Sequence, residues 1–122
     1  MSSIILVDDQ PIANFITRKL LEIEGYKENV VDFTNPEEAL IYLEDKQNTI
    51  IFLDLNMPEM DGWEFLDYLK SKSKKHRIII LTSSTSIIDR NKAKEYESVI
   101  DYVEKPLNKN KFKDLQPLLQ QQ

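Results

Sequence analysis

The chain contains five short apolar runs in which hydrophobic residues mostly do not alternate with polar ones. These runs are rich in β-branched side chains, and they are Ile4 to Val7, Val30 to Phe33, Ile50 to Leu53, Ile78 to Leu81 and Ile100 to Val103. Continuous apolar runs of this length are typical of strands that are covered on both faces, as in a parallel sheet. The pattern therefore predicts five buried strands.

Helical patterns lie between these strands. The first places five apolar residues on one face at helical spacing, and Gly25 follows as a stop; the five are Ile12, Phe15, Ile16, Leu20 and Ile23. The second pattern begins with Asn35 as N-cap and Pro36 in the first turn, and it runs through Leu43.

Three further helices follow. Asp61 can cap a helix that carries Phe65, Leu66 and Leu69. A weakly amphipathic helix is expected around Ile88 to Tyr96. A last helix begins at Asn108 and bears Phe112, Leu115 and Leu118, and Pro117 is expected to disturb its final turn.

Five strands alternating with five helices predict an α/β fold, a doubly wound (βα)5 sandwich built on a five-stranded parallel sheet. The linkers are short and no change in composition divides the chain. We therefore expect one domain, residues 1–122, with no attached output domain.

Composition and charge narrow the functional classes. The 122 residues are 41% hydrophobic and 30% charged, with a net charge of −5 and no cysteine. The acidic balance argues against direct nucleic-acid binding, which requires a basic face. No apolar run approaches the roughly 18 residues of a membrane span. The beginning of the chain also lacks the features of a signal peptide, so we expect a cytoplasmic protein.

Polar residues follow four of the five predicted strands. They are Asp8 and Asp9 after the first, Asp54 and Asn56 after the third, Thr82, Ser83 and Ser84 after the fourth, and Lys105 with Pro106 after the fifth. Because the carboxyl ends of parallel strands meet at one edge, these side chains should converge. One ammonium cannot neutralise three carboxylates, whereas Mg²⁺ favours such oxygen ligands. The sequence therefore predicts a magnesium site with a carboxylate free to attack a phosphoryl group.

Each of these features also has an ordinary structural explanation. An Asp-Asp pair after a strand is often a helix cap, Lys-Pro is a common turn, and Thr-Ser-Ser usually opens a loop. The combination at four strand ends, in this order, is far more specific than any one of its parts.

The combination resembles the receiver domain of bacterial two-component response regulators. The resemblance rests on Asp8-Asp9, on Asp54-Leu-Asn56-Met-Pro58 with Asp61-Gly62, on Leu81-Thr82-Ser83 and on Lys105-Pro106. It covers essentially the whole chain and implies the flavodoxin-like, CheY-like strand order 2-1-3-4-5. It also implies a stand-alone signalling domain that catalyses only its own phosphorylation and dephosphorylation.

The resemblance implies a role for each site residue. Asp54 becomes the aspartyl phosphate; Asp9, Asp54 and the backbone carbonyl of Asn56 hold Mg²⁺, and Asp8 acts largely through a metal-bound water. Thr82 and Lys105 bind phosphoryl oxygens. Tyr102 matches the aromatic switch position that responds to Thr82, and Pro106 matches a proline often preceded by a cis bond.

The implied partners are a sensor histidine kinase or a histidine phosphotransfer protein, and an unidentified downstream protein. The face formed by the fourth helix, the fifth strand and the fifth helix would report the phosphorylation state. We also expect His76, the only histidine, to be a solvated surface residue.

Three other functions remain open from the sequence. A haloacid-dehalogenase-like Mg²⁺-dependent phosphatase would require a second acid where Asn56 stands. A flavodoxin-like cofactor binder would require a phosphate-binding loop where Asp8 and Asp9 stand. A pseudo-receiver that only binds other proteins would not need the intact set of acids with Lys105.

Overall fold

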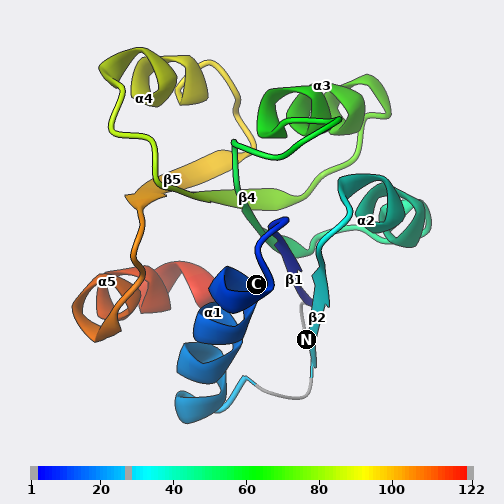
Figure 1. Ribbon diagram of the computed structural model, residues 1–122. Helices are drawn as coiled ribbons and strands as arrows, with labels where there is room; N and C mark the ends of the chain where they lie inside the picture. Colours follow the sequence, from blue (N-terminus) through cyan, green and yellow to red (C-terminus); the bar gives the residue numbers. More distant parts are fainter. Residues whose placement is uncertain (1–2, 27–28, 121–122) are drawn as a thin grey trace.

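The computed structural model describes residues 3–26 and 29–120, so residues 1–2, 27–28 and 121–122 of the expected domain lie outside the described part. Its strands are β1 (Ile4–Val7), β2 (Val30–Phe33), β3 (Ile50–Leu53), β4 (Arg77–Thr82) and β5 (Val99–Glu104). All neighbouring pairs are parallel, in the order β2-β1-β3-β4-β5. The predicted fold class and strand order are confirmed (Figure 1).

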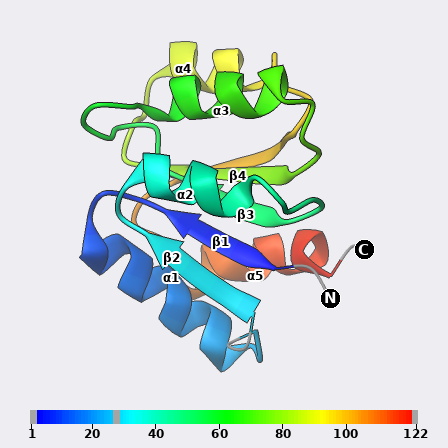
Figure 2. The same ribbon diagram turned by 90° about the vertical axis from the view of Figure 1, so that its right-hand side faces the viewer.

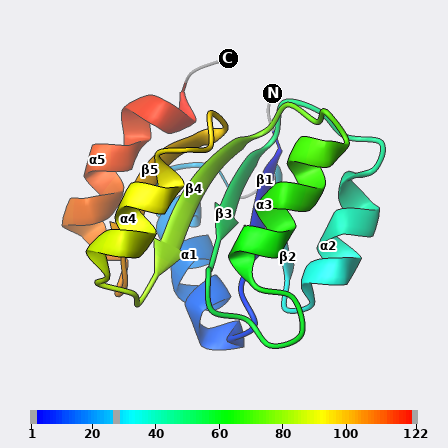
Figure 3. The same ribbon diagram turned by 90° about the horizontal axis from the view of Figure 1, so that it is seen from above.

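Five helices cover the two faces of the sheet. They are α1 (Pro11–Ile23), α2 (Pro36–Leu43), α3 (Gly62–Ser71), α4 (Ile87–Ala93) and α5 (Lys109–Leu119). Figures 2 and 3 show α2, α3 and α4 on one face and α1 with α5 on the other. Successive strand residues therefore enter different cores: Ile5 packs in the core that contains Phe65 of α3, and Leu6 in the core that contains Phe112 of α5.

The helix boundaries largely follow the predicted caps. The Asn35 side chain accepts from the N–H groups of Glu37 and Glu38, and Asp61 forms a capping box with Glu64. Two details differ from the predictions. Helix α4 already ends at Ala93. Helix α5 continues past Pro117 to Leu119, because Pro117 lies in the last turn and removes only one backbone donor there.

The apolar face of α1 is largely turned to solvent. Ile12 is 65% and Ile23 is 66% exposed, and Phe15 is also exposed. The helix instead buries Asn14, Thr17 and Leu21. Helical spacing correctly groups the apolar residues on one face, but it does not show that this face meets the sheet.

The expectation that His76 is a solvated surface residue is wrong. Its side chain is only 4% exposed, at the point where the chain enters β4. The ring Nδ1 lies 2.8 Å from the Thr49 hydroxyl oxygen and accepts from the Thr49 N–H at 3.3 Å. Polar neighbours in the sequence suggested solvent, whereas the loop before β3 covers the ring.

Within the described residues, no helix combines the length and the apolar composition that crossing a bilayer requires.

Candidate functional site

Three carboxylates meet at the carboxyl edge of the sheet. Asp8, Asp9 and Asp54 each offer one oxygen, and these oxygens all lie within 4.8 Å of one another. The backbone places two of the acids there: the N–H of Asp8 donates to the Phe33 carbonyl, and the N–H of Asp54 donates to the Val7 carbonyl. Each acid therefore stands one residue beyond a strand while its backbone still belongs to the ladder. Asp54 is only 4% exposed, so its carboxylate is largely removed from water.

Lys105 is the cation of this cluster. Its Nζ lies 2.6 Å from Asp8 Oδ2 and 3.5 Å from Asp54 Oδ2. Its backbone N–H donates to the Thr82 carbonyl at 2.7 Å, which ties the residue to the end of β4. The Lys105–Pro106 peptide bond is cis, as the resemblance implies.

The charges of the cluster are not balanced by protein groups alone. Two like charges 4 Å apart repel by about 4 kcal/mol at an effective dielectric constant near 20. Burial raises the pKa of Asp8, and the repulsion from Asp54 adds to this effect, although hydrogen bonds from Lys105 and from the Gln10 N–H oppose it. Oxygen-only ligands with surplus negative charge are the donor set that suits Mg²⁺. The three acids therefore fit the predicted metal.

Thr82 and Asn56 complete the side of the site next to β4. Thr82 is fully buried, and its Oγ1 accepts from Asn56 Nδ2 and from the Ser84 N–H, each at 3.3 Å. The Asn56 N–H donates to Asp54 Oδ1, also at 3.3 Å. Because two donors occupy the oxygen of Thr82, its own proton remains available for a phosphoryl oxygen.

Tyr102 is held against the loop that follows Thr82. Its hydroxyl donates to the Ser84 carbonyl at 3.2 Å, and the Arg90 guanidinium lies 4.6 Å from the centre of its ring. The Ser84 hydroxyl in turn donates to Asp89 of α4 at 2.7 Å. A chain of contacts therefore joins the loop after Thr82 to α4 and β5, the elements expected to report phosphorylation.

Gly62 sets the distance between α3 and the residues that follow β3. A Cβ at this position would lie 2.7 Å from the Asp54 carbonyl oxygen and 2.8 Å from Leu55 Cα. The Gly62 N–H also donates to the Leu55 carbonyl at 3.0 Å. Glycine is required here because the two backbones approach closely.

Two residues near the site were missed by the sequence analysis. Asn14 is buried in α1, and its side-chain amide donates to the carbonyls of Asp8 and Phe33 at 3.2 and 3.1 Å. Lys111 of α5 contacts the backbone on both sides of Lys105. The only feature of the sequence that could have indicated Asn14 is its polar side chain within an amphipathic helix. No feature indicated Lys111, because it is one of several lysines on a basic helix.

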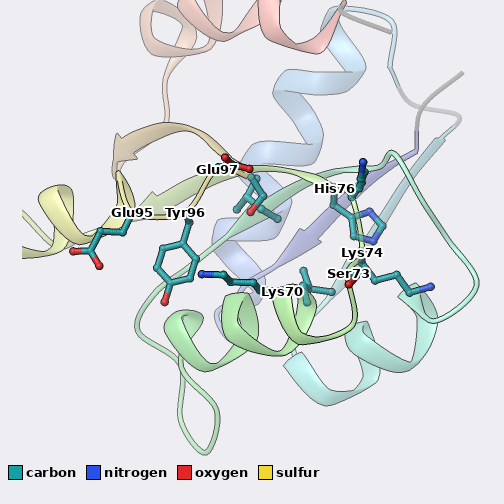
Figure 4. Close-up of a pocket in the computed structure, with 11 residues that line it drawn as sticks. Lys70, Ser73, Lys74, His76, Glu95, Tyr96 and Glu97 are labelled. Atoms are coloured by element: carbon teal, nitrogen blue, oxygen red, sulfur yellow. The ribbon is translucent and has the colours of Figure 1, made fainter.

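A separate half-open cavity of about 730 Å³ lies at the opposite end of the sheet, where β4 begins (Figure 4). Its lining includes three lysines and two glutamates: Lys70, Lys74, Lys75, Glu95 and Glu97. No residue of the carboxylate site lines it, and its mixed charges favour no ligand class.

Comparisons with known proteins identify the family. The model of the response regulator receiver domain matches residues 4–115. The transcriptional regulatory protein CpxR of Escherichia coli is 36% identical over 110 residues, which are 88% of this chain and 44% of CpxR. The chain belongs to the response regulator receiver domain family.

Solved structures agree with this assignment. A two-component response regulator from Cytophaga hutchinsonii has a TM-score of 0.84 at 29% identity, with 98% of this chain and 96% of that chain covered. The response regulator TrrA from Thermotoga maritima, solved in complex with Mg²⁺ and BeF, has a TM-score of 0.80 at 28% identity and coverages of 98% and 99%. The alternative functions are not favoured by these findings. The chain spans less than half the length of the first curated relatives that it matches.

Proposed function

We propose that Asp54 of this receiver domain accepts a phosphoryl group and that the protein signals its phosphorylation state by protein–protein contact. The observation that carries the proposal is the buried Asp54 carboxylate, grouped with Asp8 and Asp9 and lying beside the Lys105 ammonium. We assign no turnover of external substrates to this site, and its only chemistry is the transfer to Asp54 and the later hydrolysis.

The transfer needs an in-line nucleophile and neutralised phosphoryl oxygens. An Asp54 carboxylate oxygen attacks phosphorus, and the bond from phosphorus to the imidazole nitrogen of the donor breaks. The electron pair of that bond stays on the nitrogen. Lys105 then pairs with one phosphoryl oxygen and the Thr82 hydroxyl donates to another. Mg²⁺ held by Asp9, Asp54 and the Asn56 carbonyl, with Asp8 acting largely through a metal-bound water, would supply the remaining positive charge next to the phosphoryl group.

Receiver domains are phosphorylated by histidine kinases or histidine phosphotransfer proteins, and we infer such a donor for this chain. The first turns of α1 support this inference, because Ile12, Phe15 and Ile16 are exposed and follow directly on Asp8 and Asp9. A protein that brings a phosphohistidine to Asp54 must cover this rim, and an apolar face favours such contact. The downstream protein would bind over α4, β5 and α5, and a cytoplasmic location stays a prediction.

Labelling with a small phosphodonor such as acetyl phosphate tests the proposal. We expect the wild type to gain one hydroxylamine-sensitive phosphoryl group, since an acyl phosphate is labile to this nucleophile and a phosphoserine is not. Asp54→Asn should abolish labelling and keep the fold, while the exposed Asp114→Asn should label normally. Strong residual labelling of Asp54→Asn, for instance at Ser83 or Thr85, would contradict the assignment. Turnover of small phosphate esters would instead favour a phosphatase.

A further inference from the structure

Lys111 contacts the backbone carbonyls that flank Lys105. Its Nζ lies 2.6 Å from the Glu104 carbonyl oxygen and 3.2 Å from the Pro106 carbonyl oxygen. One ammonium on the first turns of α5 therefore bridges the residue before Lys105 and the residue after it. Hydrogen bonds from a charged donor are about twice as strong as those between neutral groups.

The position of β5 explains why these carbonyls need a partner. β5 is an edge strand, so carbonyls on its outer side cannot be paired by another strand. At Lys105 the inner side is satisfied, because its N–H donates to the Thr82 carbonyl. At Glu104 the Lys111 ammonium takes the place of the missing strand.

The segment from Glu104 to Pro106, called the Lys105 turn below, also contacts α4. The Glu104 carboxylate pairs with Arg90 at 2.6 Å, but both side chains are more than a third exposed. An exposed ion pair is weak. The Lys111 contact is different because it acts on the backbone itself. The two carbonyls that Lys111 binds belong to the residues on either side of Lys105, so the contact fixes the backbone from which the Lys105 side chain extends.

We propose that Lys111 is a positioning residue that holds the Lys105 turn so that the Lys105 ammonium meets Asp8 and the phosphoryl group on Asp54. The proposal rests on the phosphoacceptor function proposed above. Lys111 itself touches no reacting atom and acts through the backbone on either side of Lys105. Without its ammonium, the turn loses its hold from α5 and the Lys105 side chain reaches the site less often.

The test replaces Lys111 with methionine, which keeps the unbranched stem and the helix propensity but removes the charge. Lys111→Arg keeps the cation. Lys113→Met is the matched control, because Lys113 lies on the same helix, is exposed, and its side chain makes no hydrogen bond or ion pair within residues 3–26 and 29–120. The readout is the NMR signal of the Lys105 ε-methylene group, identified by its loss in Lys105→Ala. It is recorded first without metal and then during titration with beryllofluoride and Mg²⁺.

We expect the metal-free Lys105 signal of Lys111→Met to shift toward that of a free lysine. Half-saturation by beryllofluoride should require about tenfold more mimic, in the range seen when a residue supporting a metal site is removed. Lys111→Arg and Lys113→Met should resemble the wild type. Circular dichroism checks that each variant is folded, and Lys111→Gln replaces Lys111→Met if that variant is not.

Two results would overturn the proposal. In the first, folded Lys111→Met shows the wild-type Lys105 signal and is half-saturated at the wild-type concentration of beryllofluoride. In the second, Lys113→Met changes the Lys105 signal and the half-saturating concentration as much as Lys111→Met does. A merely structural role would lower the melting temperature and leave the Lys105 signal unchanged well below it. Failure of the phosphoacceptor function would appear elsewhere, as a wild type that acetyl phosphate does not label.

Discussion

The Lys105 ammonium pairs more closely with Asp8 than with Asp54, at 2.6 Å against 3.5 Å. Asp8 is therefore the nearer partner of the only cation in the described site, and Asp54 makes the longer contact. On the proposed function, a phosphoryl group on Asp54 would compete with Asp8 for this ammonium. We therefore expect phosphorylation to move Lys105 from Asp8 toward Asp54.

Lys105→Ala should leave phosphorylation partly intact but uncouple it from the conformational change at Thr82 and Tyr102. The charge-assisted contact that is lost is worth about 1.5–3 kcal/mol, which is comparable with the few kcal/mol between two conformers of a switching protein. Amide NMR spectra of the wild type and the variant, each with and without beryllofluoride, provide the measurement. Shifts from Ser83 to Tyr102 as large as those of the wild type would show that Lys105 is not the coupling residue.

Asp9→Asn should weaken Mg²⁺ binding, because it removes one of three clustered carboxylates. Trp63 fluorescence can follow the titration, since Trp63 adjoins Gly62 and Gly62 contacts the backbone of Asp54 and Leu55. Asp114→Asn carries the same charge change far from the cluster and should bind normally. Phosphorylation of the wild type that proceeded equally well in excess chelator would argue against a metal requirement.

Gly62→Ala should lower both stability and the rate of Asp54 phosphorylation. A methyl group 2.7 Å from the Asp54 carbonyl oxygen forces α3 or the segment that follows β3 to move. Gly25→Ala is the comparison: its φ of +90° makes alanine strained, but no atom lies within 4 Å of the new Cβ. Both variants should unfold at a lower denaturant concentration than the wild type, and only in Gly62→Ala should Asp54 be phosphorylated more slowly. Equal phosphorylation rates in the two variants would refute this role of Gly62.

His76 should make stability fall as the pH falls from 6.5 to 4. Burial, with a smaller contribution from the Lys74 ammonium, lowers the pKa of His76 from 6.5 to about 4. In this window the unfolded chain binds the extra proton and the folded protein does not, so up to about 3 kcal/mol of stability is lost. Asp8 acts with the opposite sign, because its raised pKa makes its contribution present at low pH and lost as the pH rises.

Urea unfolding of the wild type and of His76→Asn at several pH values separates these two effects. Asparagine keeps an acceptor for Thr49 but does not titrate, so the loss between pH 6.5 and 4 should be smaller in the variant. If the free energies of unfolding of the wild type and the variant fall in parallel as the pH is lowered, the buried His76 ring does not control the acid sensitivity.

The sequence by itself determined the strands, their parallel arrangement and the convergence of the acids. Continuous β-branched runs are stable only when both faces are covered, and parallel strands bring their carboxyl ends to one edge. The positions of Asp8, Asp54, Thr82 and Lys105 at strand ends follow from this logic without coordinates. The caps at Asn35 and Asp61 were equally predictable, because an N-cap depends on residues within one turn.

Only the tertiary structure decided which faces and side chains are covered. Helical spacing gathers Ile12 and Ile23 on one side of α1, but the buried side is the one where Asn14 bonds the Asp8 and Phe33 carbonyls. His76 is buried because a loop 27 residues away in sequence supplies Thr49. Lys111 reaches Glu104 only because α5 packs beside the open edge of β5. Such contacts depend on the relative placement of separate elements, and local hydrophobic patterns do not encode this placement.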